Sequence, residues 1–151
     1  MRKIIKCNKV DYPSLTDLWE RSVRATHDLL TDDAIAAIRE DMLSKYLPNA
    51  GIYAIKDNRR VCGFIGVSND KIEMLFVDSD KLRQGYGSAL LDFAMMRGYR
   101  RVDVNEQNEG ALAFYLSKGF RVIGRDDTDA EGRDYPILHL SLKPASASIS
   151  A

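Results

Sequence analysis

The spacing of apolar and polar residues predicts strands and helices that alternate along the chain. Short apolar runs bounded by turn residues indicate strands, and apolar residues at intervals of three and four indicate amphipathic helices. The predicted strands cover 3–7, 52–56, 61–67, 74–77, 101–104, 120–124 and 136–142, and the predicted helices about 12–25, 32–46, 86–96 and 109–118. The resulting order, β-α-α-β-β-β-α-β-α-β-β, predicts an α/β fold.

Residues at the element boundaries agree with this order. Thr31-Asp32-Asp33 can cap the second helix, Asn108 is a good N-cap, and Gly119 suits the position after a helix end. The polar residues 57–60 predict a hairpin between two strands. No linker or repeat interrupts the pattern, so a single domain is expected over 1–143, followed by a flexible small-residue tail at 144–151.

Composition excludes several classes of protein. Lys and Arg number 22, as do Asp and Glu, so the net charge is zero and nucleic acid is not expected as a partner. No apolar run approaches 18 residues, so no membrane span is predicted. No signal-peptide apolar region follows Met1, which predicts a cytoplasmic protein.

Cysteine and histidine are too few and too scattered to predict a metal site. Cys7 and Cys62 stand far apart, and the chain has two histidines and no H-E-x-x-H. Both cysteines are expected to be free and buried. An exposed last strand would allow pairing between subunits, so the expected state is a monomer or a homodimer.

The most informative stretch joins a short buried strand at 74–77 to a helix through a glycine-rich loop, Arg83-Gln84-Gly85-Tyr86-Gly87-Ser88. The unpaired N–H groups and the positive dipole end of such a helix favour an anion. The loop lacks the Gly-Lys-Ser/Thr of a Walker motif, and Leu90 stands where a dinucleotide fingerprint has its third glycine. The alternative is an ordinary strand-to-helix turn.

A second segment, at 108–120, makes the interpretation of the loop more specific. The two segments together resemble the GNAT family of acetyl-CoA-dependent N-acetyltransferases. Residues 82–87 resemble its R/Q-x-x-G-x-G/A motif, with Leu82 in place of the usual Arg or Gln, and 108–120 match N-x-x-A-x-x-F-Y-x-x-x-G-F at every fixed position. Residues 21–28, 104–108 and 135–136 also look like a bacterial subgroup of YjaB-type acetyltransferases.

This resemblance implies the GNAT fold, a central mixed, mostly antiparallel sheet of about seven strands flanked by four helices. It also implies transfer of the acetyl group of acetyl-CoA to an amine by direct attack in a ternary complex. The loop backbone would hold the pyrophosphate, and the strand at 74–77 would pair with the pantetheine arm. The cofactor-binding residues expected on this basis are Leu75, Phe76, Val77, Arg83, Gln84, Gly85, Tyr86, Gly87, Ser88, Asn108 and Tyr115.

Two residues are the expected catalytic groups. Tyr115 matches the family residue that protonates the leaving thiolate; the alternative is a half-buried helix residue that packs on the core. Glu73 precedes the arm-binding residues, and strand alternation would turn it into the cleft as a general base for the acceptor amine. The alternatives for Glu73 are a solvent-facing position, with His27 or a water relay as the base.

The acceptor is not named by the sequence. His27 either contacts the acceptor or is a surface histidine that caps a helix end, and Asn105 is a further candidate for acceptor contact. The acceptor would be a small-molecule or peptide amine. Two other functions stay open: a GNAT-like module that binds a CoA thioester without catalysis, and a domain that binds some other phosphorylated ligand.

Overall fold

A computed structural model describes residues 1–26 and 30–142 of the chain. His27, a candidate base and acceptor contact, and the predicted tail at 144–151 lie outside the described residues. The chain divides into two compact units, Met1–Tyr99 and Arg100–Ala151.

The described elements follow the predicted order, which is therefore confirmed. Most strands are one to three residues longer than the apolar runs that predicted them. The elements are β1 (Arg2–Lys6), α1 (Tyr12–Thr26), α2 (Asp32–Asp41), β2 (Gly51–Asp57), β3 (Arg60–Ser68), β4 (Lys71–Val77), α3 (Tyr86–Met96), β5 (Arg101–Asn105), α4 (Glu109–Ser117), β6 (Phe120–Asp126) and β7 (Ile137–Leu142).

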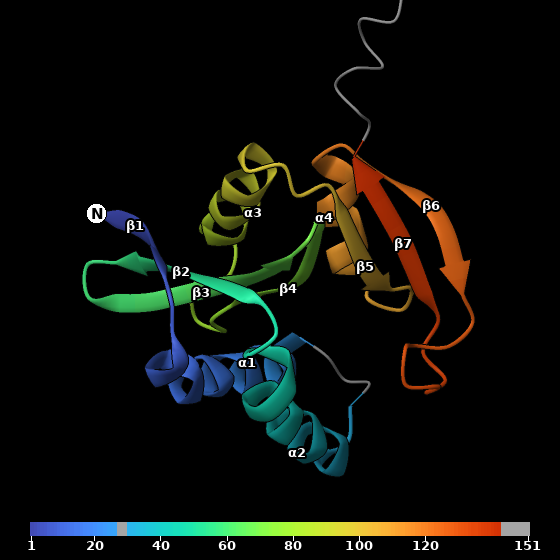
Figure 1. Cartoon of the computed structure of the whole chain (residues 1–151), viewed down its shortest axis with the longest axis horizontal. Coiled ribbons are helices and arrows are strands. Elements are labelled where there is room, and N and C mark those ends of the chain that lie inside the picture. Colours follow the sequence, from blue (N-terminus) through green and yellow to red (C-terminus); the bar gives the residue numbers. More distant parts are fainter. Residues whose placement is uncertain (27–29, 143–151) are drawn as a thin grey trace, which may run out of the picture. The chain divides into compact units, whose positions relative to one another are not determined.

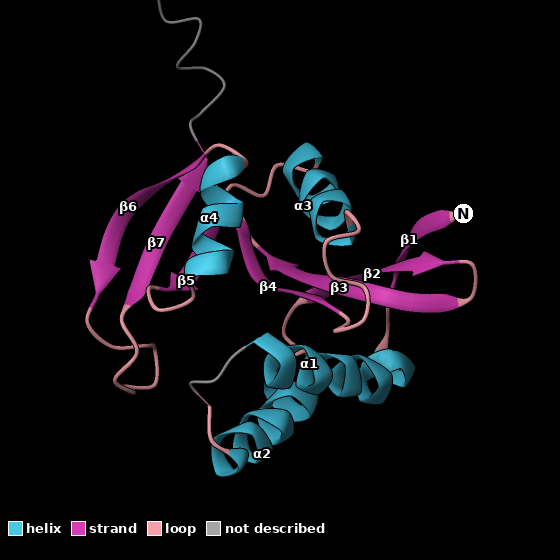
Figure 2. Ribbon diagram, turned by 180° about the vertical axis from the view of Figure 1, so that it is seen from behind, coloured by secondary structure: helices cyan, strands magenta, loops and turns pink. Residues whose placement is uncertain are grey.

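The first unit is built on an antiparallel sheet in the order β1-β2-β3-β4. Helices α1 and α2 cover one face of this sheet, and α3 covers the other (Figure 1 and Figure 2). The apolar stripe predicted for α1 forms the core beneath the sheet, where Leu15, Leu18 and Trp19 are each at most 3% exposed. On the opposite face, Leu90 and Leu91 of α3 are fully buried.

The second unit is an antiparallel sheet in the order β5-β7-β6, with α4 packed against it. The Asn108 side chain accepts a hydrogen bond from Ala111 N (3.1 Å), and Gly119 has a φ of 98°, so the predicted cap and end of α4 are confirmed. No helix among the described residues combines the length and the apolar character needed to cross a bilayer.

Two local features differ from the sequence expectation. The β2–β3 turn spans only residues 58 and 59, because Asn58 adopts a left-handed conformation (φ 58°) that closes a two-residue turn.

The second predicted helix ends its α-helical part at Asp41 and continues as a π turn, Met42–Tyr46, where Leu47 N donates to Met42 O (3.0 Å). The residues that predicted this helix, Ile35, Ile38, Met42 and Tyr46, keep ordinary α-helical spacing, so the pattern did not reveal the π turn.

We predict that Gly63→Ala destabilises the protein by about 1–3 kcal/mol, the usual cost of overpacking a core. A Cβ at position 63 would lie 2.8 Å from the Phe76 carbonyl oxygen, which is backbone and cannot turn aside, and 3.3 Å from Leu90 Cδ1. Urea unfolding followed by circular dichroism measures the change.

Gly110→Ala is the matched control. A Cβ there meets nothing closer than 4.0 Å, and Gly110 lies in α4 without a positive φ. This variant should be more stable by about 0.5–1 kcal/mol, because alanine loses less backbone entropy in a helix. Equal stability of the two variants would show that β3 and β4 are not closely packed at Gly63.

Candidate active site

A β-bulge in β4 determines the direction of Glu73. The register between β3 and β4 passes from Gly66 opposite Met74 to Val67 opposite Ile72, so Glu73 is an extra residue on β4. In a regular strand Glu73 and Met74 would point to opposite faces. A bulge re-aims the side chain next to it, and both residues line the same cavity. The bulge, and not the simple alternation expected from the sequence, turns Glu73 toward this cavity.

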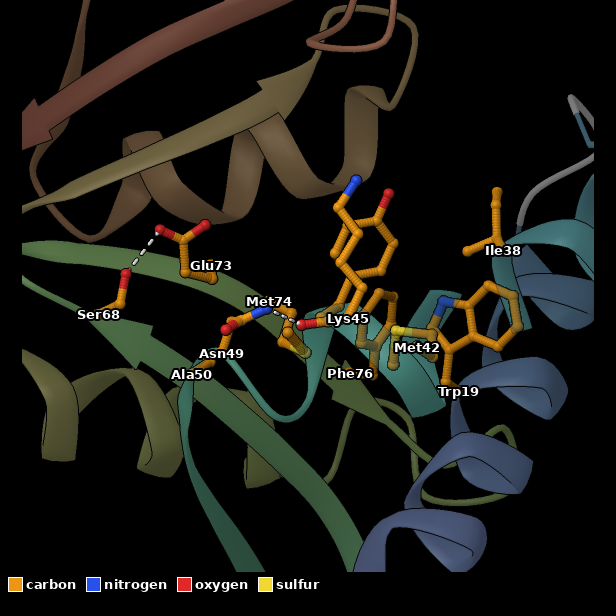
Figure 3. A pocket seen from close by; sticks show the side chains of 11 residues that line it. Trp19, Ile38, Met42, Lys45, Asn49, Ala50, Ser68, Glu73, Met74 and Phe76 are labelled. Carbon is orange, nitrogen blue, oxygen red and sulfur yellow. Dashed lines mark hydrogen bonds between the residues drawn. The ribbon is translucent and has the colours of Figure 1, made fainter. Parts of the chain in front are cut away.

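The cavity lies within the first unit and has a volume of about 500 Å³. Apolar side chains from α1, α2, the π turn and β4 form much of its wall, and polar groups come from the π turn, the residues after it, β3 and β4 (Figure 3). Ser68 Oγ donates a hydrogen bond to Glu73 Oε1 (3.0 Å), which orients the carboxylate. The lining residues are Trp19, Ile38, Met42, Lys45, Tyr46, Asn49, Ala50, Ser68, Glu73, Met74 and Phe76.

The residues around Glu73 on β4 divide between the two faces of the sheet. Met74 and Phe76 pack against the core beneath α1 and α2 and line the cavity. Leu75 and Val77 alternate with them and so face the side of α3. Of the expected cofactor-binding residues of β4, Phe76 alone lines the cavity with Glu73.

The loop after β4 ends in a left-handed N-cap for α3. Gly85 has a φ of 86°, and Arg83 has a φ of 61°, which is uncommon for a residue with a side chain. Ala89 N donates to Gly85 O (3.0 Å), which is the first backbone hydrogen bond of α3. The N–H groups of residues 86–88 lie before this bond, at the start of the helix. Their direction and the helix dipole suit an anion such as a phosphate.

The first strand reaches this loop through Arg2, which the sequence did not single out. Arg2 Nη2 donates to Gln84 O (2.5 Å), and its guanidinium lies 4.0 Å from the centroid of the Tyr86 ring. The Tyr86 hydroxyl donates to Asp57 Oδ2 (2.8 Å), and this bond raises the pKa of Tyr86 to about 12. A contact across 82 residues of sequence has no local signal, so only the fold reveals it.

Asp78 anchors the start of the loop. Its carboxylate, 2% exposed, accepts bonds from Arg21 Nε (3.0 Å) and Nη2 (2.9 Å) on α1, and from Ser79 N (2.8 Å). Arg60 Nη2 of β3 lies 3.4 Å from the same carboxylate. The Arg21 guanidinium holds the pKa of Asp78 below its usual range. A helix and a strand therefore fix the point where β4 turns into the loop.

The remaining expected site residues belong to the second unit. Tyr115 is 6% exposed and packs edge-on against Phe114 and Phe120, with ring centroids 5.2 and 5.5 Å away. Burial raises the pKa of its phenol far above the ordinary value, so the hydroxyl stays protonated at neutral pH. Asn105 Oδ1 accepts from Gln107 N (2.8 Å), and Asn105 O accepts from Asn108 N (2.9 Å).

Comparisons with known proteins identify the family. The family model of the acetyltransferase (GNAT) domain matches residues 48–122. The peptidyl-lysine N-acetyltransferase YjaB of Salmonella typhimurium is 38% identical over 128 residues, which are 83% of this chain and 88% of that protein. The chain therefore belongs to the GNAT family of acetyltransferases.

Solved structures agree with this assignment. The solution structure of apo YjaB from Escherichia coli has a TM-score of 0.86 at 33% identity and covers 96% of this chain and 99% of that chain. The PaiA N-acetyltransferase of Thermoplasma acidophilum, solved with coenzyme A, has a TM-score of 0.70 at 20% identity and covers 92% of this chain and 98% of that chain. The expected GNAT fold and the likeness to YjaB-type enzymes are confirmed, and the protein is an N-acetyltransferase.

We predict that Arg21→Ala lowers the free energy of unfolding at pH 7 by about 1–2 kcal/mol. Removing one partner of a fully buried pair costs about 3–5 kcal/mol. The value here is smaller because the Arg21 side chain is 52% exposed and Arg60 stays close to Asp78.

The same variant should unfold at a higher pH on acidification. A carboxylate with a lowered pKa stabilises the fold above its unfolded pKa of about 3.9, and this stabilisation is lost as the pH falls through the folded pKa. Without Arg21 that loss begins at higher pH. Arg24→Ala, three residues along α1, is the control and should change little, because its partners are the exposed Asp32 and the half-buried Glu20, neither of which is fully buried as Asp78 is. Identical acid-unfolding curves for both variants would contradict the anchoring role of Asp78.

Proposed function

We propose that the protein transfers the acetyl group of acetyl-CoA to the side-chain amine of a lysine in a peptide or protein. The observation that carries this proposal is the bulged Glu73, whose carboxylate lines a cavity with an aromatic wall. Such a cavity suits the apolar stem and the amine of a lysine. The relatives named peptidyl-lysine N-acetyltransferases support this acceptor class.

The loop after β4 would hold the acyl donor. The N–H groups at the start of α3 would bind its pyrophosphate, and glycine at 85 and 87 lets the phosphate approach closely. The backbone of Leu75, Phe76 and Val77 would pair with the pantetheine arm as an added strand. Asn108 would contact the same arm. The donor supplies an acetyl thioester, which is the reactive group.

Glu73 acts as the general base in this proposal. A lysine amine has a pKa near 10.4, so it is mostly protonated at neutral pH and must lose a proton before it attacks. The Glu73 carboxylate removes that proton, directly or through a water. The amine nitrogen then bonds to the acetyl carbonyl carbon and gives up its second proton to water, and the carbon–sulfur bond breaks to release an amide and a thiolate.

Tyr115 stabilises that thiolate as a hydrogen-bond donor. The family resemblance implies a full proton transfer from Tyr115 to the thiolate. A phenol is a weaker acid than a thiol, whose pKa is about 8.5, and burial raises the pKa of Tyr115 further, so the proton favours the tyrosine oxygen. Solvent then completes the protonation of the thiolate. His27 and Asn105 remain candidates for acceptor contacts.

The cytoplasm is the proposed location. Cys7 and Cys62 are both free and buried, as expected where thiols stay reduced. A monomer or a homodimer is proposed. The expected pairing through an exposed last strand is wrong, because β7 lies between β5 and β6. The strand that ends the order in the second unit is β6, which carries the exposed Val122 and Ile123.

The first test measures CoA release from acetyl-CoA with a lysine peptide, for the wild type and Glu73→Gln. We expect kcat to fall by about a hundredfold or more at pH 7, the usual loss on removing a general base. The dissociation constant of acetyl-CoA should stay unchanged. Activity of the variant should rise toward pH 10, where the free amine is present without a base.

Glu40→Gln, an exposed carboxylate of α2 outside the cavity, is the matched control and should behave as the wild type. Unchanged kcat in Glu73→Gln would assign proton removal to His27 or to a water relay. No binding of acetyl-CoA by the wild type would overturn the donor site.

Tyr115→Phe should lower kcat about 10- to 100-fold, which is the value of a hydrogen bond to a charged group. The ring contacts with Phe114 and Phe120 persist in the variant, so stability and acetyl-CoA affinity should change little. Stopped-assay kinetics with calorimetric titration separates the two effects. A wild-type kcat in this variant would leave Tyr115 as a packing residue.

A further inference from the structure

We propose that Arg2 is a positioning residue for the acyl donor, which holds the loop between β4 and α3 in the conformation that binds the pyrophosphate of acetyl-CoA. This inference rests on the proposed function, and it assigns a task to a residue outside both sequence motifs. Its structural basis is that Arg2 of β1 contacts Gln84 and Tyr86 and lies beside Gly85.

The backbone of this loop is unfavourable without outside support. Arg83 has a left-handed φ of 61°, and Gly85 has a φ of 86°, so Gln84 lies between two left-handed residues. A residue with a side chain keeps such a conformation only where its surroundings hold it there. The Gln84 side chain donates to Asp80 O within the loop at 3.4 Å, which is long for a hydrogen bond. The conformation therefore depends on contacts from outside the loop.

Arg2 makes such a contact with a backbone carbonyl. Its Nη2 donates to Gln84 O (2.5 Å), and a bond from a charged donor is stronger than one between neutral groups. The carbonyl of Gln84 and the N–H of Gly85 belong to one planar trans peptide group, so they point in opposite directions. By holding the carbonyl on its own side, Arg2 turns the Gly85 N–H to the other side of the loop. The bond thus fixes the direction of one of the N–H groups expected to face the pyrophosphate.

The same guanidinium also holds the first residue of α3. It lies 4.0 Å from the centroid of the Tyr86 ring, and the Tyr86 hydroxyl donates to Asp57 Oδ2 (2.8 Å). Asp57 stands directly opposite Arg2 in the pairing of β1 with β2. The start of α3 is therefore attached to one end of this strand pair by two contacts. A Cβ at position 85 would lie 3.3 Å from Arg2 Nη1, so the glycine also leaves room for the guanidinium.

The experiment measures the dissociation constant of acetyl-CoA by calorimetric titration for the wild type and Arg2→Ala. We expect it to rise roughly tenfold in the variant, the usual value of a hydrogen bond from a charged group, because the ligand itself must then order the loop. In the CoA-release assay the KM for acetyl-CoA should rise by the same factor. The kcat at saturating acetyl-CoA should stay at the wild-type value, since Arg2 does not act on the reacting groups.

Arg2→Lys tests the same idea with a conservative change. Lysine keeps a charged N–H donor for Gln84 O but lacks the planar group that lies over the Tyr86 ring. Its dissociation constant for acetyl-CoA should therefore lie between those of the wild type and Arg2→Ala. Affinity no better than that of Arg2→Ala would contradict the role assigned to the bond with Gln84.

Lys3→Ala is the matched control. It removes the same charge from the next residue of β1, which strand alternation turns to the other face of the sheet. This variant should bind acetyl-CoA as the wild type does. Equal affinity in Arg2→Ala and the wild type would overturn the inference alone, and so would a loss of kcat in Arg2→Ala, which would mark a general disturbance of the fold. If the wild type itself does not bind acetyl-CoA, the proposed donor site fails as well.

Discussion

The bulge in β4 is the constraint on which the cavity depends. It requires an extra residue opposite β3 and room for the displaced side chain beside it. Gly66 supplies that room, because a Cβ there would lie 2.8 Å from Met74 Cγ and 3.0 Å from Ile52 Cδ1. Gly66, Glu73 and Met74 thus act together: the glycine lets Met74 pack inward, and the inserted residue turns the carboxylate to the same side.

One strand connects the two parts of the candidate site in the first unit. Glu73 lies near the middle of β4, and Asp78 follows its last residue, about 16 Å away at the usual rise of a strand. Arg21 and Arg60 hold Asp78 from α1 and β3, so the loop starts from a fixed point. If Glu73 serves the acceptor and the loop serves the donor, as proposed, rigid backbone between them would help to align the two substrates.

The sequence predicted the fold well where the signal is local. Element order follows from apolar periodicity, and the caps at Thr31 and Asn108 follow from side chains that bond their own helix. The glycine-rich loop was likewise visible as a local pattern. The direction of Glu73 was not visible in the sequence, because a bulge depends on the pairing with the partner strand. The contact of Arg2 with Gln84 was not visible either, because only the folded sheet brings these two residues together.

The family model matches only part of the chain. This explains why the residues expected to bind the acyl donor are easier to predict than those that bind the acceptor. Residues 48–122 include β4, the loop and α4, which carry the expected donor-binding and catalytic groups. Trp19, Met42 and Lys45 line the cavity from outside this segment. The matched segment thus holds the residues expected for the shared reaction, whereas α1 and the π turn supply part of the cavity wall from outside it. If the acceptor binds in this cavity as proposed, its contacts with α1 and the π turn lie beyond the reach of the family pattern.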